Sequence, residues 1–292
     1  MLKAILRWVL LLATLLVVGP LLAHAARTLR DVDGGNAFTL LVGESPLRGV
    51  LLGAGACAAA LVLGLIGSRF FALNAGYAMA GLVLGWASWE LGDVEDIIRR
   101  ARDGSDMTRL ALEGGVLTGI AAVIAAVLSR VAAKHRPTPD GVKNPVGGLR
   151  AALFHADSHA NNATAALAAL AGAAGCAAAV WIVCVTPLKG QALFATFMGG
   201  IAAGAAANAA AGAKAHVQPA VGILGMLIVA VAGPIVARLI HGPEIVEAVF
   251  ANRLFPPARP LSLDWASGAL LGVPIGMSWT GAVLDVRAVE TS

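Results

Sequence analysis

Charged residues are excluded from eight long apolar segments of this 292-residue chain, which limits its possible folds more than any other feature. The chain carries 21 Lys and Arg and 17 Asp and Glu residues, yet Glu113 is the only one of them inside these segments. Each segment has 18–22 residues, enough for an α-helix rising about 1.5 Å per residue to cross a hydrocarbon core about 30 Å thick. The segments are 8–25, 49–67, 71–89, 110–129, 164–184, 191–212, 219–237 and 266–284.

This pattern predicts an all-α fold, a polytopic transmembrane helical bundle with about eight spans. The longest connection, 130–163, is shorter than the roughly 50 residues that a separate domain needs. We therefore expect residues 1–292 to form a single integral-membrane domain surrounded by the lipid bilayer. A soluble enzyme, a disulfide scaffold and a disordered chain are excluded, because all three carry more polar sequence or more cysteine than this chain.

The first segment fits two interpretations. Lys3 and Arg7 precede an apolar run that ends in Ala23-His24-Ala25, the layout of a cleaved signal peptide. The same residues fit a retained span, and cleavage of residues 1–25 would leave seven spans. Lys and Arg are almost evenly divided between the two sides, so the positive-inside rule alone does not set the orientation. The loop 130–150 is the densest basic stretch and has few acids, which favours a cytoplasmic location for 130–163. We expect a bacterial-type cytoplasmic (inner) membrane, with the N-terminus inside if it is uncleaved.

Small residues recur at the spacing of a helix face. Gly268, Gly272 and Gly276 are four apart, and Asn208 continues a similar row of small residues in 191–212. Because lipid cannot drive apolar helices together, close backbone approach and interhelical hydrogen bonds must do so. We expect glycine-rich helix packing and an interhelical hydrogen bond from Asn208. The alanine-rich hairpin 164–212 and the Gly268/Gly272/Gly276 face are the predicted contacts with other membrane subunits or a second copy.

Two stretches outside the segments predict short helices lying at the membrane surface, 94–103 and 244–255. In the second, Ile245, Val249 and Phe250 are expected to share one apolar face.

One cluster has metal-ligand chemistry, namely His155, Asp157 and His159 in the 130–163 loop. Imidazole and carboxylate are common ligands of divalent metals. All three side chains share a side only if the stretch is extended. The cluster is a candidate metal site, but the chain contains no HExxH motif to support it.

Three features suggest polar or translocation positions within the membrane. Glu113 is an acid below the interface, where ionisable residues are functional candidates, although it could also reach the headgroups or pair with Arg109. Asn208 is a second polar position. Pro234 and Pro274, each flanked by glycine, predict broken helices of the kind that line transporter sites.

These features favour a non-enzymatic scaffold, assembly factor or accessory subunit of a membrane complex. The alternatives are a small-solute channel or permease at Pro234 and Pro274, and a metal-dependent membrane enzyme at His155, Asp157 and His159. No catalytic residue or cofactor is predicted. A nucleic-acid partner is not expected either, because a broad basic face with stacking aromatics is missing from the sequence.

Overall fold

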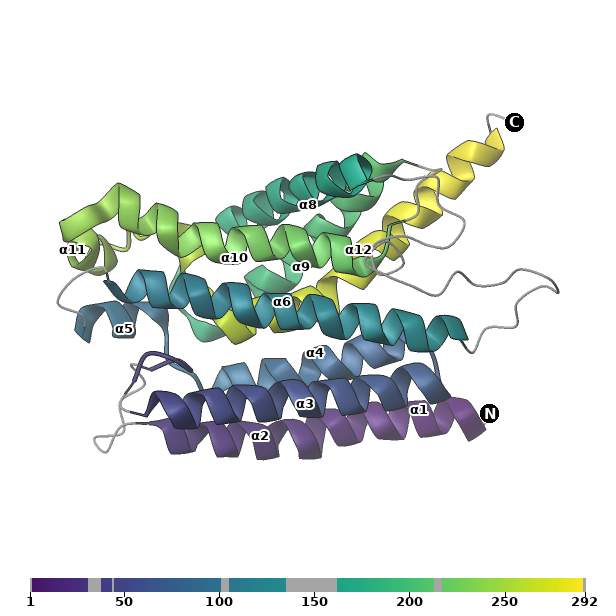
Figure 1. The fold of residues 1–292 in the computed structure, drawn as a ribbon, viewed down its shortest axis with the longest axis horizontal. Helices are drawn as coiled ribbons and strands as arrows, with labels where there is room; N and C mark the ends of the chain where they lie inside the picture. The colour runs from purple at the N-terminus through teal and green to yellow at the C-terminus, as the bar shows by residue number, and fades with distance from the viewer. Residues whose placement is uncertain are drawn as a thin grey trace.

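The computed structural model of the chain describes residues 2–30, 38–43, 45–100, 105–134, 162–212 and 217–290. Their long elements are helices that lie roughly side by side, so the predicted all-α bundle is confirmed (Figure 1). The long helices are α1 (Leu2–Ala13), α2 (Gly19–Ala26), α3 (Pro46–Phe70), α4 (Leu73–Trp89), α6 (Ser105–Lys134), α8 (Asn162–Val183), α9 (Lys189–Ala211), α10 (Pro219–His241) and α12 (Ser262–Glu290).

Six helical stretches of the described residues are long and apolar enough to cross a membrane. They are Leu2–Leu29, Pro46–Phe70, Asp106–Ala133, Asn162–Val183, Lys189–Ala211 and Pro219–Phe250. The chain is therefore an integral membrane protein. The predicted segments 71–89 and 266–284 lie on α4 and α12, which complete the bundle without belonging to this group, so the count of eight spans stays a prediction.

Helix α12 forms the centre of the bundle, because it packs against α4, α6, α9 and α10. Its first half is buried on all sides. The first helix runs from α1 through a π-helical stretch, Thr14–Val18, into α2 and lies at the edge of the bundle, where it contacts α4 (Figure 1). A six-residue turn, Phe38–Gly43, follows in the described chain and enters the bundle beside α3.

Helices α8 and α9 form the antiparallel hairpin expected from the short link between them. Helix α9 packs between α8 and α12, whereas α8 keeps an exposed face on the outside of the bundle. The hairpin is thus central on its α9 side only.

The glycines of α12 lie against the backbone of α9. A Cβ atom at Gly268 would overlap Thr196, one at Gly272 would overlap the Phe197 carbonyl oxygen, and one at Gly276 would overlap the Ile201 carbonyl oxygen. The predicted use of the Gly268/Gly272/Gly276 face for contact with another subunit is therefore wrong, because α9 of the same chain already occupies it.

Neither proline interrupts its helix. Pro234 lies inside α10 and Pro274 inside α12, and both helices continue through them. The prediction of broken helices is wrong for the backbone at both positions. Proline still removes one N–H donor, which leaves the carbonyl one turn earlier without its helical partner.

Two short helices lie at one end of the bundle, α5 (Val94–Arg100) and α11 (Ile245–Phe250). They confirm the helical character of the two stretches. Helix α11 is shorter than the predicted 244–255, whereas 101–103 of the first stretch lie outside the described residues. Ile245 and Val249 are buried as expected, whereas Phe250 is exposed and lies under the Arg99 guanidinium.

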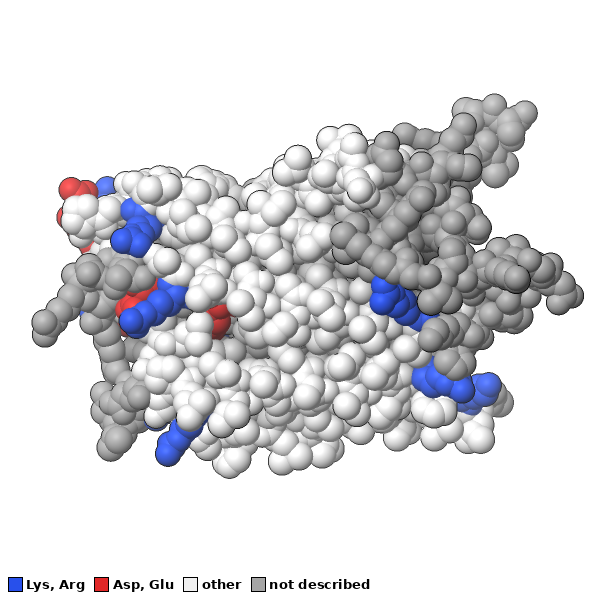
Figure 2. Space-filling model, viewed as in Figure 1, with Lys and Arg blue, Asp and Glu red and all other residues white. Residues whose placement is uncertain are grey.

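The end that carries α5 and α11 is called the acidic end. Every acidic side chain that the structure describes lies there, and the described side chains at the opposite end carry only positive charge (Figure 2). The acids are Glu90, Asp93, Glu95, Asp96, Asp106, Glu113, Glu244, Glu247 and Asp264, and the basic residues opposite are Lys3, Arg7, Arg69 and Arg130.

Candidate functional site

The acidic end contains a layer of buried ionic side chains, beginning with Glu113. The Glu113 residue is only 2% exposed. Its carboxylate accepts hydrogen bonds from the Thr39 hydroxyl at 2.7 Å, from the Leu41 amide at 2.9 Å and from the Leu40 amide at 3.4 Å. The Ser262 hydroxyl at the start of α12 also donates to it. Three donors of the turn Phe38–Gly43 and one donor of α12 therefore bond the Glu113 carboxylate inside the bundle.

The turn Phe38–Gly43 can approach Glu113 closely because the α3 residues that face Leu40 are glycines. A Cβ at Gly49 would overlap the Leu40 carbonyl, and one at Gly53 would lie 2.7 Å from the Leu40 side chain. Thr39 closes the turn, since its amide donates to the Val42 carbonyl at 2.7 Å. The turn thus presents consecutive amides to the carboxylate, an arrangement that binds an anion without a basic side chain.

A second carboxylate, Asp264, is fully buried at the start of α12. The Lys189 ammonium lies 3.0 Å from it and is itself largely covered. Asp264 also accepts hydrogen bonds from the Leu261 amide at 2.8 Å and from the Ser88 hydroxyl. This ion pair joins the beginnings of α9 and α12 to the end of α4.

Asp93 lies near this pair in the loop that leads to α5. Burial raises the pKa of Asp93 to about 6, although the Lys189 charge acts in the opposite direction. Asp93 lies outside the helices that cross the membrane, and a carboxyl group with this pKa changes its charge near neutral pH.

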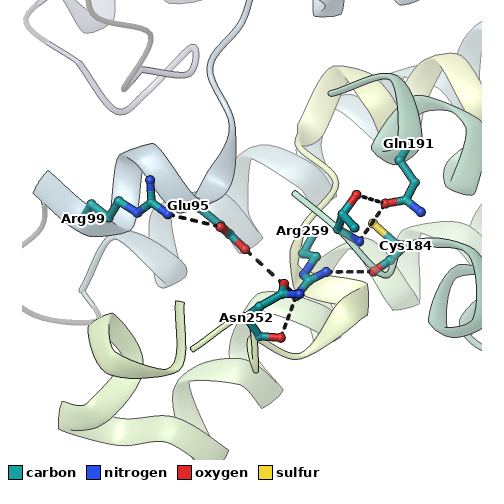
Figure 3. A network of polar contacts seen from close by, with 7 residues as sticks. Glu95, Arg99, Cys184, Gln191, Asn252 and Arg259 are labelled. Carbon is teal, nitrogen blue, oxygen red and sulfur yellow. Dashed lines mark hydrogen bonds and ion pairs between the residues drawn. The ribbon is translucent and has the colours of Figure 1, made fainter. Parts of the chain in front are cut away.

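Arg259 joins the loops at the acidic end (Figure 3). Its guanidinium donates to the Cys184 carbonyl at 3.2 Å and to the Asn252 side-chain oxygen at 2.7 Å. It also lies 4.0 Å from the Glu95 carboxylate, which faces Arg99 on its other side. Burial raises the pKa of Glu95. One buried arginine therefore links the chain after α8, the chain after α11 and helix α5.

Glu90, at the end of α4, holds the first helix to the bundle. Arg27 and Arg30 lie 2.9 Å and 2.7 Å from its two carboxylate oxygens. The hydrogen bond from Arg27 holds the pKa of Glu90 below its ordinary value. These arginines follow the Ala23-His24-Ala25 pattern, so cleavage after residue 25 would leave them in the chain.

The candidate residues from the sequence have different outcomes. His155, Asp157 and His159 lie outside the described residues. In the part of the chain that the structure describes, no group of three His, Cys, Asp or Glu side chains is arranged to hold a metal ion. Glu113 is in the buried layer. It does not bond Arg109, which instead lies 3.5 Å from Asp106.

Asn208, Pro234 and Pro274 lie away from this layer. The Asn208 amide donates to the Met277 carbonyl at 3.3 Å, which confirms the predicted interhelical hydrogen bond between α9 and α12. Pro234 and Pro274 are buried within α10 and α12. The structure therefore does not bring these three residues together with Glu113 into one site.

Thr39, Asp264 and Arg259 were not predicted from the sequence as parts of a network. Asp264 and Arg259 directly precede the last apolar segment, a position that is also typical of residues exposed to headgroups. Neither residue therefore carries a local signal of burial.

The Glu90, Glu113 and Asp264 carboxylates accept hydrogen bonds from donors of the same chain, and Glu95 lies between Arg259 and Arg99, so these carboxylates act as structural anchors. The fold and these anchors define the chain as an all-α integral membrane protein with a polar layer near one surface. Comparison with protein-family models, curated proteins and solved structures finds no match for it.

Proposed function

We propose that this chain is a single integral-membrane domain that serves as a non-enzymatic scaffold, assembly or accessory subunit of a membrane complex. The observation that carries the proposal is the packing beside Pro274. Gly200 and Gly204 of α9 face the α12 backbone so closely that a methyl group on either would overlap it. Glycine-rich packing of this kind supports a rigid frame better than a path for a solute.

The distribution of buried polarity also supports a structural role. The buried charged side chains of the described residues all belong to the acidic end: Glu90, Glu95, Glu113, Arg259 and Asp264. Deeper buried polar groups of the described residues are uncharged hydroxyls, such as that of Ser267, which donates to the Gly81 carbonyl at 2.9 Å, and that of Thr118, which has no hydrogen-bond partner. Ion-coupled transport uses ionisable groups near the membrane centre, and the described residues do not supply them there.

The outer face of α8 is the surface that we assign to a partner subunit. It exposes the small residues Ala166, Ala174 and Ala178 among the large residues Leu170 and Ile182. Alanine gains little from lipid, whereas it lets a second helix approach closely. The hairpin 164–212 was one of the two predicted partner contacts, and the present proposal keeps its α8 face.

Site-specific photo-crosslinking in native membranes tests this proposal. A photoreactive residue at Leu170, which is 59% exposed, is compared with one at Val123 on α6, which is 62% exposed. We expect a protein adduct from position 170 and only lipid adducts from position 123. Lipid adducts from both positions, together with a monomer in native mass spectrometry, would overturn the proposal.

The same purified protein separates the two alternatives. Solute flux in proteoliposomes that is lost in Pro274→Ala combined with Gly272→Leu would favour a channel or permease. Stoichiometric zinc, copper, iron or manganese that is lost on replacing His155, Asp157 and His159 would favour a metal enzyme.

We propose that the acidic end faces away from the cytoplasm of a bacterial-type inner membrane and that the N-terminus is inside. The number of Lys and Arg residues at the two ends does not set this orientation under the positive-inside rule. The proposal rests on the acids, which among the described side chains all lie at the acidic end, and on the basic, acid-poor loop 130–150 of the sequence. Labelling of single cysteines introduced at Lys3 and Glu247 by an impermeant reagent tests the assignment.

A further inference from the structure

An apolar groove with a volume of about 410 Å³ lies on the outside of the bundle between α6 and α10. On α6 the small residues Ala111 and Gly115 leave room, and the exposed side chains of Leu112 and Val116 flank it. This surface belongs to two stretches that are long and apolar enough to cross the membrane, so hydrocarbon is the medium around it.

Val231 and Ile235 form the wall of the groove on α10. Arg238 follows at the next position of the same helix face, since residues three and four apart are neighbours on a helix. Its guanidinium donates to the hydroxyl of Thr108, which lines the groove on α6, at 2.5 Å. Arg238 therefore stands at the mouth of the groove, near the acidic end.

The Arg238 side chain gives this end of the groove a positive charge that is accessible from outside the bundle. Arg238 is exposed, and among the described residues no carboxylate lies within ion-pair distance of it. Asp106 on the first turn of α6 is already 3.5 Å from Arg109. An anion in the headgroup region can thus approach the Arg238 guanidinium from the membrane side.

The groove is too narrow to hold a whole helix between its walls. From Thr108 to Val116 the groove runs about 12 Å along α6 at 1.5 Å per residue. The volume of about 410 Å³ then corresponds to a cross-section of roughly 34 Å², less than half that of a helix about 10 Å wide. The space suits one extended hydrocarbon chain.

We propose that this groove binds an acyl chain of an anionic phospholipid whose phosphate contacts Arg238. The apolar walls recognise the chain, and the planar guanidinium can donate two parallel hydrogen bonds to the phosphate. The lipid would occupy the leaflet at the acidic end. This inference does not depend on the proposed partner surface, which lies on α8.

Native mass spectrometry with two phospholipids of identical chains tests the proposal, one phosphatidylglycerol and one phosphatidylcholine. For the wild type we expect one retained phosphatidylglycerol, bound about fivefold to tenfold more tightly than phosphatidylcholine. Arg238→Gln should remove the preference. Arg48→Gln, at an exposed arginine at the start of α3 away from the groove, should keep it.

Ile235→Trp fills the groove from its exposed wall and should weaken the retention of both lipids. Equal binding of the two lipids by the wild type would overturn the proposal. So would equal losses in Arg238→Gln and Arg48→Gln, or unchanged retention in Ile235→Trp. Circular dichroism and thermal unfolding of each variant confirm that altered retention does not reflect misfolding.

Discussion

The Thr39 hydroxyl and the Glu113 carboxylate lie 2.7 Å apart although 74 positions separate them in the chain. This bond holds the turn Phe38–Gly43 inside the bundle, and the Leu40 and Leu41 amides reinforce it. Burying a carboxylate inside the bundle costs free energy unless hydrogen-bond donors satisfy it. Here the backbone of the turn supplies them, so Glu113 and the turn stabilise each other.

Replacing Glu113 with Gln should loosen the turn. Glutamine keeps one acceptor oxygen but loses the negative charge, and a hydrogen bond to a charged group contributes about 2 kcal/mol. Hydrogen exchange of the Leu40 and Leu41 amides should become at least tenfold faster. Glu247→Gln, at a largely exposed acid of the same end, is the control. Unchanged exchange in Glu113→Gln would show that the carboxylate does not anchor the turn.

Replacing Lys189 with Met should strongly destabilise the bundle. Asp264 is fully buried, and removing its partner leaves an uncompensated charge that costs about 3–5 kcal/mol. Adding Asp264→Asn should recover much of this loss, because the neutral amide no longer needs a cation. Unfolding in mixed micelles measures the free energies. A double variant less stable than Lys189→Met would contradict the assigned pairing.

Stability should depend on pH through Asp93. Burial raises the pKa of Asp93 to about 6 from its ordinary value near 3.8, so the folded state binds the proton more tightly than the unfolded state. The free energy of unfolding should therefore fall as pH rises from about 4 to 6 and level off above that range. Thermal unfolding of wild type and Asp93→Asn across pH 4–8 checks this. Their difference should change sigmoidally, and a constant difference would refute it.

Adding a methyl group at Gly276 should separate α9 from α12. The Cβ would overlap the Ile201 carbonyl, and backbone cannot move aside without shifting the helix, so we expect a loss of about 1–3 kcal/mol or more. Gly281→Ala on the same helix is the matched control, because its Cβ would lie 3.8 Å from Asn208 in ordinary contact. Equal stability of the two variants in detergent unfolding would contradict the close packing.

Much of the fold could be predicted because hydrophobicity and helix length are local properties. The segment 49–67 lies within α3, and the segment 191–212 lies on α9 except for Gly212. The helical hairpin followed from the short link 187–190. The interhelical hydrogen bond of Asn208 was also predicted, since a polar side chain on a row of small residues has few partners other than a neighbouring helix. Broken helices at Pro234 and Pro274 were wrongly predicted, because a helix packed among neighbouring helices tolerates a proline and both helices continue through it.

The candidate site was much harder to predict. Glu113 was identified as unusual from its position alone, but its partners come from a turn and from Ser262, far away in the chain. Asp264 and Arg259 have the sequence context of headgroup residues, yet they are 0% and 4% exposed. Nothing local distinguishes an interfacial charge from one that later elements cover.

The location in the membrane and the helical structure could therefore be predicted from the sequence, since the bilayer disfavours charge in each span independently of its neighbours. Which charges meet, which glycine face is covered and where a groove opens depend on how α6, α9, α10 and α12 pack together. Those are pairings between distant segments, and their free energies arise only when the helices are in contact.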